Sequence, residues 1–250
     1  MIKIKYLIFT MFSIFVLCGP KVKITKDMTA LQRFEAAKKL IKYHKYYQAQ
    51  TELDKLRYQL MGTEYIDQIL FYLGEAYRLN KDYPEALVNY QNLVRDYPNS
   101  SYSARAQYYI GLCYKEMSLK PELDQEYTQK AISSFKDLIE LFPQNEYQDS
   151  AKIQINLLQN KLAEKSFKNG KFYFKIEKYN SAEIYFKDII LNYYNSEWID
   201  DAFFYLALTY LKENKKEDAK ALFQRIISEY KNSKYINEAK KYLKLLSEKK

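Results

Sequence analysis

The sequence contains one histidine and five glycines, and both scarcities limit the chemistry that it can perform. His44 is the only histidine, which excludes His-based metal sites and any Ser–His or Cys–His pair built on another histidine. The glycines stand apart from one another, so there is no Gly-rich phosphate-binding loop. His44 itself lies in Lys-Tyr-His-Lys-Tyr near an expected helix end, where a solvated residue is more usual than a catalytic base. The acidic pair Asp200-Asp201 is typical of the start of a helix, where carboxylates interact favourably with the helix dipole. We therefore expect no catalytic residue, no metal and no cofactor, and a protein that is not an enzyme.

Proline is equally scarce, with five residues in 250, and clustered charge is missing. Few Gly and Pro residues, without strand-type alternation, favour helices joined by short turns. The formal net charge is +9, but Lys and Glu alternate along the chain. A nucleic-acid groove would need clustered basic residues beside stacking aromatic side chains. The composition argues against nucleic acid and small-molecule substrates, whereas a mild positive charge suits an anionic membrane surface.

What the chain does contain is a repeated pairing of small and large residues. Ala37, Gly74 and Gly111 follow one another at intervals of 37 residues, and the same interval separates Gly170 from Ala207. After each comes an alanine with a large apolar residue four positions later; these pairs are Ala49–Leu53, Ala86–Tyr90, Ala131–Phe135, Ala182–Phe186 and Ala219–Phe223. A large side chain beside a small one lets two antiparallel helices pack closely, and a period near 34 residues is typical of tetratricopeptide (TPR) repeats. We predict an all-α fold, a right-handed TPR solenoid of about five helical hairpins with a C-terminal capping helix, which would present a surface to partners.

The N-terminal segment has the features of an export signal. Lysines precede an uncharged apolar run, Tyr6 to Leu17, which is too short to span a bilayer. Cys18 follows directly, which predicts a signal peptide at 1–17, a diacylated cysteine of the bacterial lipoprotein type, and a lipidated linker at 18–28. Phe15-Val16-Leu17 departs from the small residues that usually precede such a cysteine, so a retained anchor and a coincidental cysteine stay open as alternatives.

Beyond the linker, the helical pattern predicts two halves. The first, 29–146, would hold repeats 1–3, and the second, 147–250, a long helix, repeats 4 and 5 and the cap. From Tyr147 to about Lys178 the pattern continues without a proline, and the repeat interval is stretched, which predicts one long helix bridging the third and fourth repeats. The other helices are expected at 29–44, 47–60, 65–80, 83–97, 101–118, 127–142, 179–193, 198–213, 216–230 and 235–250.

Taken in order, these features resemble the BamD family, lipoproteins of the outer-membrane β-barrel assembly machinery. The resemblance covers roughly residues 28 to 245 and is most specific in the middle. The segments that carry it are Asp124-Gln125 before Lys130-Ala131-Ile132 and Phe135, Ser150-Ala151-Lys152 through Asn160-Lys161-Leu162-Ala163-Glu164, Gly170 to Phe174, and Tyr179 to Phe186. The first resembles the family's insertion in the third repeat, and the second resembles its long helix.

The resemblance implies a scaffold that is lipid-anchored to the outer membrane and faces the periplasm. It implies two partners, the barrel subunit BamA and unfolded outer-membrane proteins whose C-terminal strands carry aromatic residues. A second resemblance is to CpoB, a periplasmic TPR adaptor of the Tol–Pal cell-division system, through Phe71 to Tyr77 and Tyr97-Pro98-Asn99-Ser100. CpoB, however, has an N-terminal coiled coil, and no heptad run precedes the first hairpin in this sequence.

Candidate partner-binding residues follow from the repeat register. Residues three before and one or four after each small packing residue are expected on the concave side; in the first three repeats these include Phe34, Lys38, Phe71, Glu75, Arg78, Tyr108 and Lys115. Aromatic and basic groups together could take an aromatic C-terminal peptide and its carboxylate, although Phe34 and Phe71 could instead be core between repeats. In the C-terminal half, Trp198 and Arg225 are candidates for contact with the barrel subunit, because Trp and Arg are enriched among interface hot spots. The alternative for Trp198 is that it fills the inter-repeat core position that tyrosines occupy in other repeats.

Overall fold

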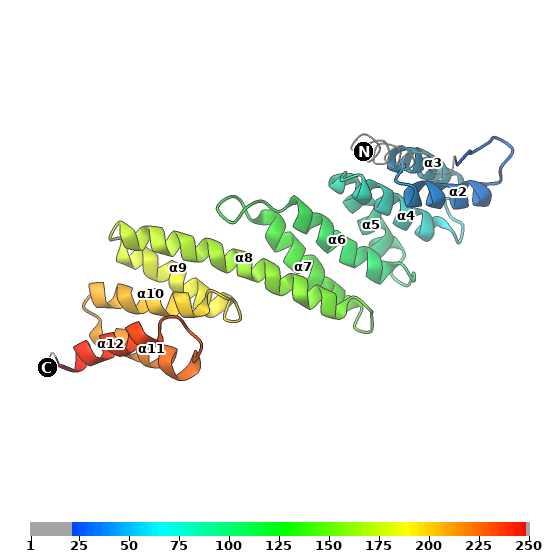
Figure 1. The fold of residues 1–250 in the computed structure, drawn as a ribbon. Coiled ribbons are helices and arrows are strands. Elements are labelled where there is room, and N and C mark those ends of the chain that lie inside the picture. Colours follow the sequence, from blue (N-terminus) through cyan, green and yellow to red (C-terminus); the bar gives the residue numbers. More distant parts are fainter. Residues whose placement is uncertain (1–21, 249–250) are drawn as a thin grey trace, which may run out of the picture. The chain divides into compact units, whose positions relative to one another are not determined.

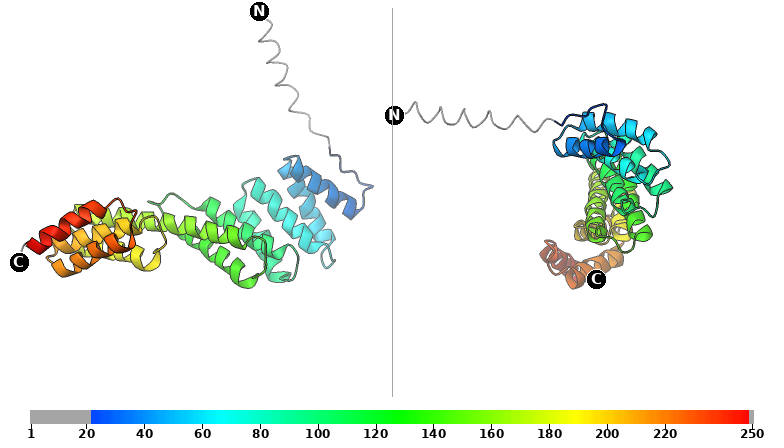
Figure 2. Two further views of the ribbon diagram at one scale, coloured as in Figure 1. Left: turned by 60° about the horizontal axis from the view of Figure 1, so that its bottom comes forward. Right: turned by 90° about the vertical axis from the view of Figure 1, so that its right-hand side faces the viewer.

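The repeated small–large pairs produce antiparallel helical hairpins. The computed structural model describes residues 22–248, and within that range the chain forms eleven helices and no strand (Figures 1 and 2). The helices are α2 (Ala30–Lys42), α3 (Tyr46–Gln59), α4 (Ile66–Leu79), α5 (Tyr83–Asp96), α6 (Ser103–Met117), α7 (Glu126–Leu141), α8 (Gln148–Lys175), α9 (Tyr179–Asn192), α10 (Ile199–Lys212), α11 (Lys216–Glu229) and α12 (Ile236–Glu248). These bounds lie within three residues of the predicted ones, and the prediction of an all-α TPR fold is confirmed. The predicted signal peptide and Cys18 lie outside the described residues.

The chain divides into two compact units, Met1–Cys113 and Tyr114–Lys250, which we call the first and second units. The boundary falls inside α6, whereas the sequence pattern places its division between residues 146 and 147. The two divisions differ because the segment 118–125 separates α6 from α7, while α7 packs against α8. The third hairpin, α6–α7, is therefore divided between the two units, unlike the other hairpins.

Close approach of paired helices explains two of the glycines. A β-carbon on Gly74 would lie 2.7 Å from the ring of Tyr90, and one on Gly170 would lie 2.7 Å from the ring of Phe186. Contacts this short are essentially never made by real β-carbons, so each ring occupies the space that a larger residue would need. The predicted wedge of a large side chain against a small one is confirmed in both units.

Four hairpins share one left-handed turn after their first helix. The residues in this conformation are His44, Lys81, Glu177 and Asn214, with φ between 58° and 69°. The residue that follows each of them donates its N–H to the carbonyl five positions earlier, as Lys45 does to Leu40 and Lys178 does to Tyr173. This bond satisfies a carbonyl that the helix end would otherwise leave open. None of these four residues is a glycine, so each pays a steric penalty for its β-carbon.

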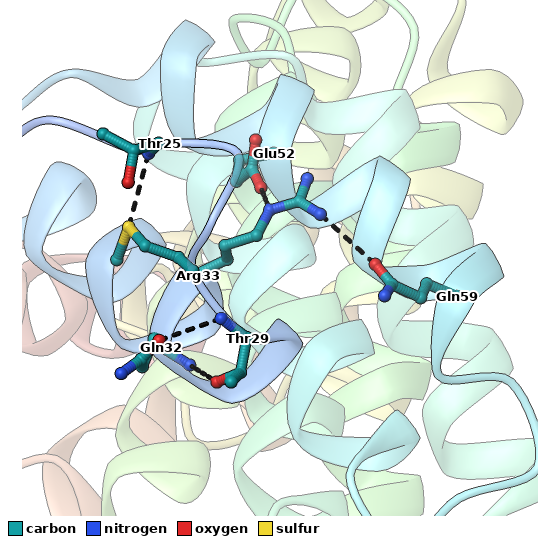
Figure 3. A network of polar contacts seen from close by, with 7 residues as sticks. Thr25, Thr29, Gln32, Arg33, Glu52 and Gln59 are labelled. Atoms are coloured by element: carbon teal, nitrogen blue, oxygen red, sulfur yellow. Dashed lines mark hydrogen bonds and ion pairs between the residues drawn. The ribbon is translucent and has the colours of Figure 1, made fainter.

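The first unit begins with a well-capped helix. Thr29 accepts a hydrogen bond from the backbone N–H of Gln32, and the Gln32 side chain accepts one from Thr29 N–H, which together form a capping box (Figure 3). Arg33 on the same helix pairs with Glu52 of α3 at 2.5 Å and donates to Gln59. These polar contacts fix α2 against α3 at the edge of a core that contains Phe34, Leu53 and Ile69.

The second unit is organised by α8, a helix of 28 residues. Figure 1 shows α7 beside its N-terminal part and α9 beside its C-terminal part, and both pack against it. The segment before α7 is held by Gln125, whose side-chain amide donates to the carbonyls of Lys120 and Leu123. From α8, Lys165 also donates to the Leu123 carbonyl at 2.5 Å. The long helix predicted from the stretched spacing is confirmed.

The last helix closes the second unit. On α12 only Ala239 is buried, while Tyr242 stacks on Phe223 of α11 with ring centroids 5.1 Å apart. The remaining face is rich in lysine and exposed, as a terminal repeat requires for solubility. The predicted capping helix is confirmed.

Candidate partner-binding surface

The two phenylalanines proposed for client binding are core residues. Phe34 is 2% exposed and Phe71 is fully buried, so neither ring offers a surface to a partner. Phe71 lies with its ring centroid 4.8 Å from that of Tyr102, 31 residues further along the chain. The same pairing joins Phe167 to Trp198 at 4.9 Å and Phe204 to Tyr235 at 4.1 Å. In the repeats of Gly74, Gly170 and Ala207, the position three residues before the small packing residue therefore packs against the next hairpin. The expectation that this position faces a groove is wrong for Phe34 and Phe71.

Trp198 is a member of this same aromatic series. It directly precedes α10 and is partly buried against Phe167, so it occupies the inter-repeat position that Tyr102 and Tyr235 fill elsewhere. The main contact of Trp198 is therefore with the core between repeats, which is the alternative that the sequence left open. Arg225 on α11 is about half exposed, pairs with Glu229 at 2.8 Å, and holds its guanidinium 4.6 Å from the ring centroid of Phe203.

Glu75, Arg78, Arg105 and Tyr109 form a polar cluster on α4 and α6 of the first unit, which we call the arginine cluster. The Glu75 carboxylate lies 4.0 Å from Arg78 and 3.8 Å from Arg105. The Arg78 guanidinium lies 4.3 Å from the Tyr109 ring centroid, and Arg105 donates two hydrogen bonds to the Tyr109 hydroxyl at 3.0 and 2.9 Å. Two guanidinium groups against one carboxylate leave this cluster with a net positive charge.

Partial exposure leaves the arginine cluster open to an anionic group. The Nε of Arg78 is buried and makes no hydrogen bond within residues 22–248. The Arg78 side chain as a whole is 21% exposed and that of Arg105 is 39% exposed, so a carboxylate would reach the accessible part of each guanidinium and not the buried Nε. Beneath it, burial raises the pKa of Tyr90 well above its usual range, so this hydroxyl stays protonated and adds no negative charge.

The other predicted residues lie around or apart from this cluster. Lys38 pairs with Glu35 at 2.5 Å and lies over the rings of Phe34 and Tyr72 at 4.9 and 5.5 Å. Tyr108 is partly buried with its ring 6.1 Å from that of Tyr109. Lys115 belongs to the second unit and donates to Gln154 at 2.8 Å.

Sequence reasoning identified Glu75 and Arg78 but missed Arg105 and Tyr109. The prediction considered only residues three before and one or four after each small packing residue, whereas these two lie six and two residues before Gly111. Their spacing of four residues places them on one face of a helix, which was the available signal.

Nothing in the described residues suggests a metal site or a membrane span. No group of three or more His, Cys, Asp or Glu side chains between residues 22 and 248 is arranged to hold a metal ion. Over the same range, every helix is too short or too polar to cross a bilayer. Cys113 is a buried thiol.

Comparisons with known proteins give one family and two curated relatives. The model of the family YfiO, described as outer membrane lipoprotein, matches residues 26–220. The outer membrane protein assembly factor BamD of Caulobacter vibrioides is 26% identical over 149 residues, 60% of this chain and 49% of that protein. BamD of Rickettsia prowazekii is 28% identical over 172 residues, 69% of this chain and 68% of that protein. The chain thus spans about half the length of the Caulobacter relative. Among solved structures, a TPR protein from Parabacteroides merdae is 15% identical with a TM-score of 0.43, covering 89% of this chain and 86% of that one.

Proposed function

The chain belongs to the YfiO family of outer membrane lipoproteins, and from this membership we propose that it is a non-enzymatic scaffold of outer-membrane β-barrel protein assembly. The observation that carries the proposal is the family match, which extends over residues in both units. The names of the two relatives support it, since both are outer membrane protein assembly factors. The fold agrees with this role, because TPR hairpins present surfaces to partners.

Unfolded outer-membrane proteins are the proposed clients of the first unit. Arg78 and Arg105 would bind the C-terminal carboxylate of such a chain, since guanidinium groups form bidentate hydrogen bonds with carboxylates. Glu75 would hold the two guanidinium groups in place before the client arrives. The partly exposed rings of Tyr72 and Tyr109 would contact the aromatic residues of the client strand.

A BamA-like barrel subunit is the proposed permanent partner of the second unit. Arg225 is the best candidate there, because its guanidinium is held over Phe203 and yet is about half exposed. Trp198 would support that surface by packing against Phe167.

The proposed anchor is a lipid on Cys18, which would place the protein at the outer membrane facing the periplasm. Its support is the family description as a lipoprotein and the cysteine that ends the apolar segment. Radioactive fatty acid should label the wild-type chain but not Cys18→Ser; equal labelling of both, or of neither, contradicts the anchor.

Co-purification from detergent-solubilised envelopes tests the assembly role. The full chain should recover a barrel protein with repeated periplasmic domains, identified by mass spectrometry. Arg225→Ala should reduce that recovery, while Lys216→Ala on the same helix should leave it unchanged. Recovery of TolA without a barrel subunit would contradict the proposal and favour the Tol–Pal alternative.

A further inference from the structure

The N-terminal segment of the first unit is packed onto the first hairpin. Val22 and Ile24 are partly buried against the core that contains Phe34 and Leu40. Thr25 N–H donates to the sulfur of Met28, and the Thr29 capping box follows, so the segment leads directly into α2 (Figure 3). The position of Val22 is therefore fixed relative to the first hairpin.

Very little chain separates this fixed point from the proposed anchor. Four steps along the chain lead from Cys18 to Val22. A fully extended chain covers at most ~3.6 Å per residue, so these steps span about 14 Å at most. A lipid on Cys18 would therefore keep Val22 within about 14 Å of the anchored cysteine. This reach is less than two Debye lengths at physiological ionic strength, so charges beside Val22 still interact with the headgroups.

The charges along residues 22–28 and α2 are predominantly positive. Lys23, Lys26, Lys39 and Lys42 are exposed, and none makes an ion pair with another described residue. The nearby acidic groups are Asp27, which is exposed, Glu35, whose carboxylate pairs with Lys38, and Glu52, which pairs with Arg33. Exposed lysines without ion pairs among the described residues also occur on α12, as at Lys240 and Lys241, but those of the first unit lie next to the proposed anchor.

The same face also has amphipathic character. A cavity of about 770 Å³ lies along α2, and its lining combines apolar side chains such as Val22, Met28 and Leu31 with two lysines and the acidic Asp27 and Glu35. Leu31 is 42% exposed. Tyr47 on α3 lies next to Val22 and Ile24 and is 76% exposed. Tyrosine and lysine beside exposed aliphatic groups are the residues that occupy the interfacial zone of bilayers.

We infer that residues 22–31, with Lys39, Lys42 and Tyr47, form a membrane-contacting surface that binds the anionic phospholipid headgroups of the bilayer holding Cys18. The inference rests on the proposed lipid anchor, which delivers this surface to the membrane. Each lysine near an anionic surface adds to the attraction, so four of them would orient the first unit as well as strengthen attachment. A polybasic surface beside a lipid chain is a recognised two-signal mode of membrane binding.

Lysine footprinting of the full chain tests this surface without a substitution. The purified lipoprotein is reconstituted into vesicles of phosphatidylcholine, with or without phosphatidylglycerol, and treated with a water-soluble acetylating reagent. Mass spectrometry should find the acetylation of Lys23, Lys26, Lys39 and Lys42 slowed by about fivefold in the anionic vesicles, and restored by high salt. Lys216 and Lys240, exposed lysines of the second unit without ion pairs among the described residues, are internal controls. Equal reactivity in both vesicles, or equal slowing of the two controls, would overturn the inference.

Vesicle flotation separates this inference from the anchor. Flotation with both vesicles but unchanged reactivity overturns the headgroup surface and leaves the lipid anchor standing. Flotation with anionic vesicles alone supports the surface and contradicts the anchor, while failure to float with either contradicts both. Lys39→Glu/Lys42→Glu should still float yet lose the protection of Lys23 and Lys26, whereas Lys216→Glu/Lys240→Glu should retain it.

Discussion

The hairpin α4–α5 of the first unit and the hairpin α8–α9 of the second share one packing but add different chemistry to it. Gly74 against Tyr90 corresponds to Gly170 against Phe186, 96 residues later. In the same register, Arg78 corresponds to Phe174 and Arg105 to Asp201. Phe174 packs edge-on to Tyr205 at 5.9 Å, and Asp201 is buried and accepts a hydrogen bond from Tyr235 at 2.6 Å. The second unit thus uses these positions, on α8 and α10, for internal contacts, whereas the first unit has guanidinium groups at both of them, on α4 and α6.

The residue that corresponds to Glu75 makes the contrast sharper. It is Lys171, whose ammonium lies 5.4 Å from the ring centroid of Tyr205 and 5.7 Å from that of Phe167. An anionic client would meet one lysine there and two arginines in the first unit. The packing is therefore repeated, while the two arginines that we propose for carboxylate binding occur only at the α4 and α6 positions of the first unit.

The largest expected effect concerns this chemical difference. Arg78→Ala and Arg105→Ala should each weaken binding of a peptide with an aromatic C-terminus by about tenfold or more, since a hydrogen bond to a charged group contributes ~1.5–3 kcal/mol. Lys171→Ala should leave the affinity unchanged. Fluorescence anisotropy measures the affinities, and circular dichroism checks that each variant is folded.

Amidating the peptide C-terminus provides the control. If the guanidinium groups bind the carboxylate, the amide should bind the wild type at least as weakly as the free acid binds Arg78→Ala, because the variant still has Arg105. An undiminished affinity of the folded arginine variants would remove the arginine cluster from client binding.

The second prediction tests the packing that the two hairpins share. Gly74→Val and Gly170→Val should each lower the free energy of unfolding by about 1–3 kcal/mol, because the new side chain meets an aromatic ring. Lys244→Leu, at a side chain that is 78% exposed, should change stability by less than ~0.5 kcal/mol. Urea unfolding followed by circular dichroism measures each change. A harmless Gly170→Val would mean that the hairpins do not share this packing.

The third prediction concerns a hydrogen bond that the first unit has and the long-helix hairpin lacks. The Ser100 hydroxyl lies 2.6 Å from the Asp67 carboxylate, and Ser233 makes the same bond to Asp200. The hydroxyl of Ser196 is buried with no partner within residues 22–248, because the residue 33 positions earlier is Ala163. Ser100→Ala should therefore lower stability by about 1 kcal/mol, whereas Ser196→Ala should raise it by a similar amount. Thermal melting of the two variants should shift in opposite directions, and shifts of the same sign would contradict this account.

The smallest effect concerns the left-handed turns, which are alike in both units. Lys81→Gly and Glu177→Gly should each stabilise the protein by roughly 0.5–1 kcal/mol, since glycine adopts this conformation without a steric penalty. Asn214→Gly should gain less, because asparagine tolerates it better than most residues. Chemical denaturation can rank the three, and a loss of stability at Lys81 or Glu177 would show that the side chain contributes more than the strain.

The sequence predicted helices and their pairing well, because both depend on local spacing. The long helix followed from the absence of proline between Tyr147 and Lys178, and the wedges at Gly74 and Gly170 followed from the repeat register. Contacts between hairpins were harder to predict from the sequence, since they depend on how one hairpin is rotated against the next. Phe71 was assigned to a groove for this reason, although its ring packs against that of Tyr102.

The arginine cluster shows the same limit for the site. Arg78 and Glu75 lie one turn apart on α4 and could be paired from sequence alone. Arg105 joins them from another helix, so its role depends on the distance between α4 and α6, which no spacing along the chain encodes. The unit boundary inside α6 was equally hidden, because the helical pattern there is continuous.

The shared use of α8 has an evolutionary consequence. A hairpin such as α4–α5 is self-contained, so duplication or deletion of the whole pair would leave its neighbours able to stack on one another. By contrast, α7 and α9 both pack against the single helix α8. Removal of any of the three would expose to solvent a helix face that is now buried. Lineages that change their number of repeats should therefore do so outside α7–α9, and these three helices should be inherited as one block.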